Sequence, residues 1–155
     1  MKVFLAAPFT QLIDPKTGDI GVYRPTLEAI LDMLEASNVQ VFNAHRRERW
    51  GGRLDEPNVA LKLDLEDIEQ CDLLIAIIGS PPSPGVQLEI GFAIAKEKRI
   101  LLLCNRYEFI PYLNRGIAAL PNCALLKYES DADLLRIIKE HTLRVQSSTR
   151  AASPT

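Results

Sequence analysis

Residues 73–91 read LLIAIIGSPPSPGVQLEIG, and this stretch decides the fold class. The run Leu73–Ile78 is apolar on both faces, which is typical of a strand buried in a parallel sheet. A loop rich in Pro, Gly and Ser follows it, and Pro84 suits the first turn of a helix. A strand, a loop and a helix in this order form one unit of an α/β protein. In such proteins, ligands bind at the carboxyl ends of the strands.

The same unit recurs along the chain. Short apolar runs predict further strands at residues 3–7, 39–42, 100–104 and 124–126. Amphipathic stretches predict helices at residues 25–36, 57–70, 84–96 and 131–144, with a short irregular helix near 109–119. This alternation predicts a flavodoxin-like (Rossmann-like) α/β three-layer sandwich, with a five-stranded parallel sheet in the order 2-1-3-4-5. We expect a single domain over residues 1–146 and a flexible tail at 147–155.

Composition excludes several function classes. The 155 residues are 47% hydrophobic and 25% charged. This length and composition are enough to form one hydrophobic core without disulfide or metal cross-links. A formal charge of −2 argues against a nucleic-acid or anionic membrane surface as partner. The apolar segment at residues 3–7 is too short for a signal peptide or a membrane span, so we expect a cytoplasmic protein. Three cysteines without C-x-x-C spacing indicate core residues, and we expect no metal site.

Two loops should meet where the strand order reverses, at the carboxyl ends of the first and third strands. The loop at residues 8–19 is longer than the roughly 2 to 6 residues usual in compact folds. The loop at 79–85 leads into a helix start, where backbone N–H groups favour an anion. Ser83 and Gly85 are therefore candidates for binding phosphate.

Glu89 lies one turn inside that helix, on a rigid element near the expected anion. A carboxylate there could attack or stabilise an electrophilic sugar carbon. The other interpretation is structural, since Glu near a helix start complements the helix dipole. Asp64 lies between Leu63 and Leu65 in the helix at 57–70, so the pattern leaves its direction open.

Residues 43–52 read NAHRRERWGG and place the single Trp beside a His and three Arg. One interpretation is a solvated basic loop with Trp50 resting on the core. In the other, Trp50 or His45 lines a pocket for a base, and an Arg such as Arg46 neutralises phosphate.

Together these motifs resemble the nucleoside 2-deoxyribosyltransferases and the related nucleoside 5′-monophosphate N-glycosidases. The resemblance spans roughly residues 2–120 and rests on VFLAAPF (3–9), DLE (64–66) with CD (71–72), SPGVQLEIG (83–91) and KRIL (98–101). Two further segments look like the CMP and 5-hydroxymethyl-CMP hydrolases of nucleoside-antibiotic pathways, namely PFTQLIDP (8–15) and NAHRRERWG (43–51).

The resemblance implies a role for each matching residue. Glu89 would attack or stabilise the anomeric carbon, and Asp64 would donate a proton to the base. Ser83 and Gly85 would hold the 5′-phosphate. The remaining residues expected to bind substrate are Phe9, Tyr23, His45, Arg46, Trp50 and Asn114.

The resemblance also implies a homodimer or larger homo-oligomer. Residues 107–116 carry more apolar and aromatic surface than a short connection usually hides, although these side chains could instead cover the sheet edge. Pro111 stands where a related deoxynucleotide hydrolase has a Ser that reaches phosphate from the neighbouring subunit. Asn114 or Arg115 would then have to supply that contact.

The implied activity is hydrolysis of a pyrimidine nucleoside 5′-monophosphate such as CMP, giving free base and ribose 5-phosphate without a cofactor. One alternative is a nucleoside 2-deoxyribosyltransferase that exchanges bases, because the same residues permit both outcomes. The other is a nucleotide-binding module without turnover.

Overall fold

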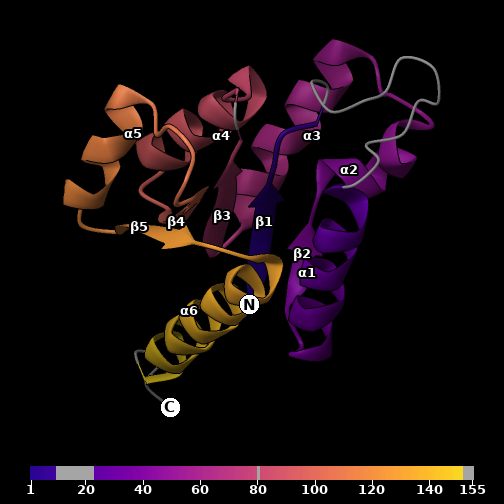
Figure 1. Ribbon diagram of the computed structural model, residues 1–155. Helices are drawn as coiled ribbons and strands as arrows, with labels where there is room; N and C mark the ends of the chain where they lie inside the picture. Colours follow the sequence, from indigo (N-terminus) through magenta and orange to yellow (C-terminus); the bar gives the residue numbers. More distant parts are fainter. Residues whose placement is uncertain (10–22, 80, 152–155) are drawn as a thin grey trace.

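The computed structural model describes residues 1–9, 23–79 and 81–151 (Figure 1). Five parallel strands form one sheet in the order β2-β1-β3-β4-β5, which confirms the predicted order. The strands are β1 (Lys2–Ala6), β2 (Gln40–Phe42), β3 (Leu73–Ile78), β4 (Arg99–Asn105) and β5 (Cys123–Tyr128). The long loop expected at residues 8–19 falls mostly outside the described residues.

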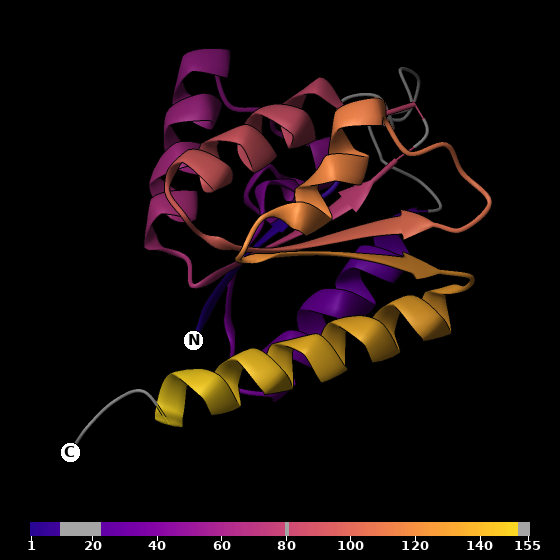
Figure 2. The ribbon, with the colours of Figure 1, turned by 90° about the vertical axis from the view of Figure 1, so that its left-hand side faces the viewer.

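Helices cover both faces of the sheet, as Figure 2 shows. Helices α1 (Arg24–Ala36) and α6 (Asp131–Ala151) pack on one face; α3 (Pro57–Gln70), α4 (Pro84–Ala95) and α5 (Tyr112–Gly116) lie on the other. Successive strand residues point to opposite faces, so Val3 and Leu5 join one core and Phe4 and Ala6 join the other. The three-layer sandwich follows from this alternation.

The carboxyl ends of β1 and β3 touch each other. A Cβ atom added to Gly79, directly after β3, would lie 2.5 Å from Cγ of Pro8. That contact is closer than real Cβ atoms allow, so glycine is needed at this position.

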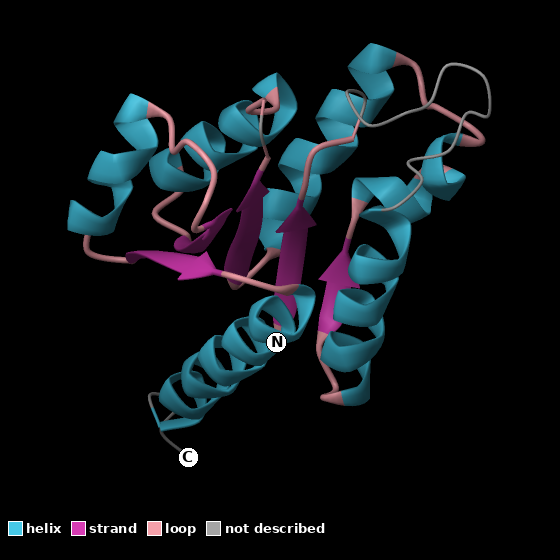
Figure 3. Cartoon of the chain, viewed as in Figure 1, coloured by secondary structure: helices cyan, strands magenta, loops and turns pink. Residues whose placement is uncertain are grey.

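One segment in the middle of the chain differs from the sequence expectation. The stretch read as a loop contains the short helices α2 (Ala44–Arg47) and η2 (Arg49–Gly51), visible as cyan ribbon beside β2 in Figure 3. Asn43 begins α2, because its side chain accepts a hydrogen bond from the Arg46 backbone N–H at 3.0 Å. The irregular helix expected near 109–119 is α5 followed by η3 (Ile117–Ala119).

The last helix was predicted too short. Helix α6 continues to Ala151, so residues 147–151 are helical where a flexible tail was expected. Val145 is buried against the core beyond the predicted end at Arg144, and the Ser148 hydroxyl accepts a hydrogen bond from Arg99. These contacts prolong the helix. Among the described residues, no helix is both long and apolar enough to cross a membrane.

Candidate active site

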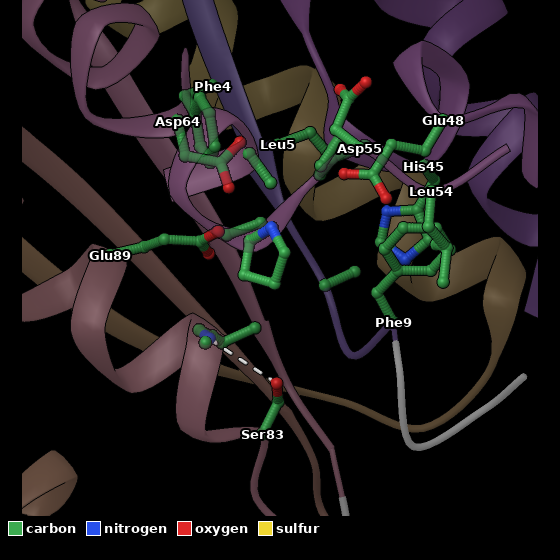
Figure 4. A pocket seen from close by; sticks show the side chains of 17 residues that line it. Phe4, Leu5, Phe9, His45, Glu48, Leu54, Asp55, Asp64, Ser83 and Glu89 are labelled. Atoms are coloured by element: carbon green, nitrogen blue, oxygen red, sulfur yellow. Dashed lines mark hydrogen bonds between the residues drawn. The ribbon is translucent and has the colours of Figure 1, made fainter. Parts of the chain in front are cut away.

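A cavity of about 280 Å³ opens at the carboxyl ends of β1 and β3, where the strand order reverses. Its walls come from β1 and the residues after it, from α2 and α3, and from the first turns of α4. The structure brings six of the expected site residues together here: Phe9, His45, Asp64, Ser83, Gly85 and Glu89. In Figure 4 the carboxyl groups of Asp64 and Glu89 both point into the cavity.

Glu89 is a half-buried carboxyl group on the cavity wall. Burial raises the pKa of Glu89 to about 8; the negative charge of Asp64 raises it further, and Arg47 opposes the rise. Glu89 therefore holds a proton at neutral pH in the protein alone. A carboxyl group with a pKa raised this far in a cavity is typical of a functional site.

Asp64 is paired with Arg47, a residue that the sequence analysis did not single out. Nη2 of Arg47 donates a hydrogen bond to Oδ1 of Asp64 at 3.0 Å. Burial raises the pKa of the Asp64 carboxyl, and the Arg47 charge and hydrogen bond lower it. Asp64 and Glu89 are thus two nearby carboxyl groups in different surroundings, one beside a cation and the other not, which is how acid and base roles are separated in many enzymes.

His45 is a buried residue of the cavity wall and is held by hydrogen bonds. Nδ2 of Asn43 donates to the Leu5 carbonyl at 3.0 Å and lies 3.3 Å from Nδ1 of His45. This network assigns the proton to Nε2 of His45, which lies 2.9 Å from the Pro8 carbonyl oxygen. Burial lowers the pKa of His45 to about 4, so the ring is neutral. Phe9 packs on it, with ring centroids 4.4 Å apart.

The first turn of α4 forms the part of the cavity suited to an anion. Ser83 begins the helix, and its hydroxyl accepts a hydrogen bond from the Val86 N–H at 3.5 Å. Gly85 lines the cavity without a side chain. The first N–H groups of a helix have no partner within the helix and carry partial positive charge, so they favour phosphate.

Arg46, which was expected to contact phosphate, does not line the cavity. Arg46 points toward α1, where Nη1 lies 2.6 Å from Oε1 of Glu35 and Nη2 donates to the Val41 carbonyl. Arg47 is surrounded by carboxylates. Among the described residues, the cavity wall includes neither Lys nor Arg.

Three other expected residues also lie off the cavity wall. Tyr23 shares a hydrogen bond with the Tyr128 side chain. Asn114 is buried in α5. The indole of Trp50 packs under the Arg24 guanidinium, 5.1 Å from the ring, which corresponds to the structural interpretation of this residue.

The backbone at Trp50 is strained. Arg49 and Trp50 have φ angles of 50° and 59°, in the left-handed region that non-glycine residues rarely adopt. Such conformations persist where the surrounding structure holds them and are frequent beside functional sites. Two contacts of Trp50 supply that support: the Arg24 guanidinium over its ring and the tilted His45 ring, whose centroid is 6.2 Å from that of Trp50.

Two further carboxyl groups line the cavity that the sequence analysis did not identify, Glu48 and Asp55. Burial raises the pKa of Glu48, and Arg47 opposes the rise. In the sequence, only their closeness to Trp50 connects these two residues with the site, and it does not show which way their side chains point. Within residues 1–9, 23–79 and 81–151, no group of three or more His, Cys, Asp or Glu side chains is arranged to hold a metal ion.

A family model described as nucleoside 2-deoxyribosyltransferase matches residues 22–112, more than half of the chain. The matched region contains Asp64, Glu89 and the first turn of α4. The chain belongs to the nucleoside 2-deoxyribosyltransferase family. The fold and the cavity described above are therefore those of a member of an enzyme family that acts on nucleosides.

Solved structures of similar proteins extend this result. The solution structure of BlsM is 34% identical, covers 99% of this chain and 97% of its own, and has a TM-score of 0.80. The CMP N-glycosidase BcmB of Clostridium botulinum is 30% identical, with coverage of 91% and 99% and a TM-score of 0.71. A 2-deoxyribosyltransferase of Bacillus psychrosaccharolyticus shares the fold at 21% identity, with coverage of 87% and 90% and a TM-score of 0.59. Comparison with curated protein sequences finds no match.

Proposed function

We propose that this protein hydrolyses the N-glycosidic bond of a pyrimidine nucleoside 5′-monophosphate such as CMP, releasing the base and ribose 5-phosphate. The observation that carries the proposal is one cavity that contains two carboxyl groups, Asp64 and Glu89, and the amino end of α4. Similarity to a CMP N-glycosidase at 30% identity supports the choice of a nucleotide substrate.

The chemistry follows from the charge that develops on the sugar. As the bond from C1′ to the base breaks, its electron pair leaves with the base, and the sugar becomes oxocarbenium-like. The Glu89 carboxylate attacks C1′ and forms an ester, while Asp64 gives its proton to the departing base. Water then attacks C1′, Glu89 leaves as a carboxylate, and Asp64 takes the proton from the water. No metal or cofactor enters this balance.

A base-exchanging transferase is the second candidate, and two observations favour it. The matching family model is that of the nucleoside 2-deoxyribosyltransferases. In addition, the described cavity wall carries no Lys or Arg to neutralise a phosphate dianion. In a transferase a second base, instead of water, would take the sugar from Glu89.

Comparison of CMP with cytidine tests the choice between these functions. We expect kcat/KM for cytosine release to be about 100-fold or more higher with CMP, because a charge-assisted phosphate site contributes binding that cytidine cannot use. Free base released from a panel of nucleoside 5′-monophosphates, measured by chromatography, identifies the preferred base. Equal rates for CMP and cytidine, or base exchange between deoxycytidine and a free base, would favour the transferase. CMP binding without release of cytosine over hours would contradict both.

We also propose that the protein functions as a homodimer or larger symmetric assembly. The segment after β4 exposes large apolar side chains: Tyr107 by 78%, Phe109 by 65%, Tyr112 by 80% and Leu113 by 81%. Such a patch is unusual on a monomer and typical of interfaces. Of the two residues considered for a contact with the neighbouring site, Arg115 is exposed, whereas Asn114 is buried in its own subunit. The proposed contact with the neighbouring subunit's site therefore depends on Arg115, whereas the assembly itself is inferred from the apolar patch.

The exposed patch leads to a prediction about assembly. Tyr112→Glu should convert the assembly to monomers at micromolar concentration and lower activity with it, since a charge in an apolar interface is left unpaired. Leu143→Asp on α6 is the control, because Leu143 is 46% exposed and α6 covers the opposite face of the sheet from α5 (Figure 2). Analytical ultracentrifugation measures the oligomeric state of both variants. A wild-type protein that sediments as a fully active monomer would rule out the interface.

A further inference from the structure

Arg47 is surrounded by four carboxylates from three parts of the chain. Besides the 3.0 Å contact with Asp64, its nitrogens lie 3.4 Å from Glu48, 3.4 Å from Asp55 and 3.6 Å from Asp67. Its side chain is only 23% exposed. Asp64 and Asp67 belong to α3, Glu48 follows α2, and Asp55 precedes α3. The guanidinium therefore connects two walls of the cavity.

Arg47 makes both hydrogen bonds and ion pairs without a hydrogen bond. Nη2 donates a hydrogen bond to Asp64, whereas the buried Nε and Nη1 atoms have no hydrogen-bond partner among the described residues. The carboxylates nearest to these two atoms, Asp55 and Asp67, are at ion-pair distance. Nη2 also donates a hydrogen bond to Oε1 of Glu48 at 3.4 Å, so the Arg47 charge stays paired with other carboxylates when Asp64 takes a proton.

The proposed reaction needs a Glu89 carboxylate and a protonated Asp64. In the protein alone, burial raises the pKa of Glu89 to about 8, and Asp64 is ion-paired with Arg47. When Asp64 takes the proton, it no longer neutralises Arg47, and the other carboxylates must do so.

We propose that Arg47 is the positioning residue that sets the protonation of Asp64 and Glu89 in the cavity. This inference rests on the proposed catalytic roles of Asp64 and Glu89. The charged groups that face the pair are Arg47 from α2, Glu48, and Asp55 from the segment before α3. His45 also lines the cavity but is neutral. Arg47 is the cation among the described residues whose charge acts on Glu89.

The ionisation of Glu89 provides a direct test that needs no substrate. Carbon-13 NMR of the labelled Glu89 carboxyl group, followed against pH, should give a midpoint near 8 in the wild type. In Arg47→Gln the midpoint should rise by roughly one pH unit, because an opposite charge that favours the carboxylate is lost. Arg46→Gln is the matched control, since Arg46 pairs with Glu35 outside the cavity, and its midpoint should not move.

Arg47→Gln leaves several carboxylates without their cation, so a second background protects the test against misfolding. Asp64→Asn combined with Arg47→Gln removes the two partners of one ion pair together. Glu89 should titrate at higher pH in this double variant than in Asp64→Asn alone. An unchanged Glu89 midpoint after loss of Arg47 in either background would overturn the proposal.

Kinetics separate positioning from a structural role. In Arg47→Gln, kcat/KM should fall at neutral pH and partly recover as pH rises, since Glu89 then ionises at higher pH. Arg47→Lys should keep most of the wild-type pH profile, because it retains the charge. A loss equal at every pH would indicate a structural role only and overturn the proposal. If the wild type releases no base from any nucleotide, the proposed function fails, whereas the NMR titration still decides the role of Arg47.

Discussion

Glu89→Gln is expected to lower turnover by about 100-fold or more while leaving nucleotide affinity nearly unchanged. The amide fills the same space in the cavity but can neither attack C1′ nor stabilise the positive charge that develops on the sugar. The loss should therefore appear in kcat with little change in binding. Cytosine release from CMP measures turnover, and isothermal titration calorimetry with CMP measures affinity.

Glu66→Gln is the matched control for this variant. Glu66 lies on the exposed side of α3, paired with Lys62, and is 51% exposed, so its loss should not affect turnover. Near-normal turnover in Glu89→Gln would contradict the proposed mechanism. Reduced affinity with unchanged kcat would instead assign Glu89 to substrate binding.

Glu89→Gln also has an expected effect on stability. The pKa of Glu89 is raised from 4.5 to about 8 in the folded protein, so between these values the unfolded chain releases a proton that the folded protein retains. Stability therefore falls as pH rises through this window. Glu89→Gln removes this dependence and should increase the free energy of unfolding by roughly 2 kcal/mol or more at pH 8. Urea unfolding of the wild type and of Glu89→Gln at pH 5 and pH 8 measures the free energy of unfolding. The same experiment shows that the inactive variant is folded.

Asp64→Asn is expected to lower turnover by roughly 100-fold, because the amide cannot protonate the departing base. The loss should depend on the base. A nucleotide whose base leaves easily as an anion needs little protonation, so the variant should act on it almost as fast as the wild type. Rates measured with a series of 5-substituted cytosine nucleotides of decreasing base pKa give this dependence.

Asp32→Asn on the exposed side of α1 is the control for this series, and it should match the wild type with every base. A constant loss across the series in Asp64→Asn would show that Asp64 acts on binding or structure and not as the acid. A steeper dependence on the base in the variant than in the wild type supports proton donation by Asp64.

Much of the fold can be predicted from local sequence patterns. Leu73–Ile78 is apolar at every position, a pattern typical of a strand that is covered on both faces. All six residues of this strand are buried. In α1, the residues Leu27, Ile30, Leu31 and Leu34 follow the helical period and face the core. Helix α2 was missed because its four residues are too few to show a period. The cap made by the Asn43 side chain stabilises this short helix.

The sequence also predicted four residues that line the cavity, Asp64, Ser83, Gly85 and Glu89, because they lie in motifs that resemble those of the family. It could not determine the direction of side chains in the segment after β2. Arg46 and Arg47 are identical neighbours, yet one pairs with Glu35 outside the cavity and the other with Asp64 inside it. Successive residues of a helix point about 100° apart, so the position of α2 relative to Glu35 of α1 and Asp64 of α3 decides which arginine pairs with a residue of the site. Only the tertiary structure contains that information, because the partners lie 11 and 17 residues away in the sequence.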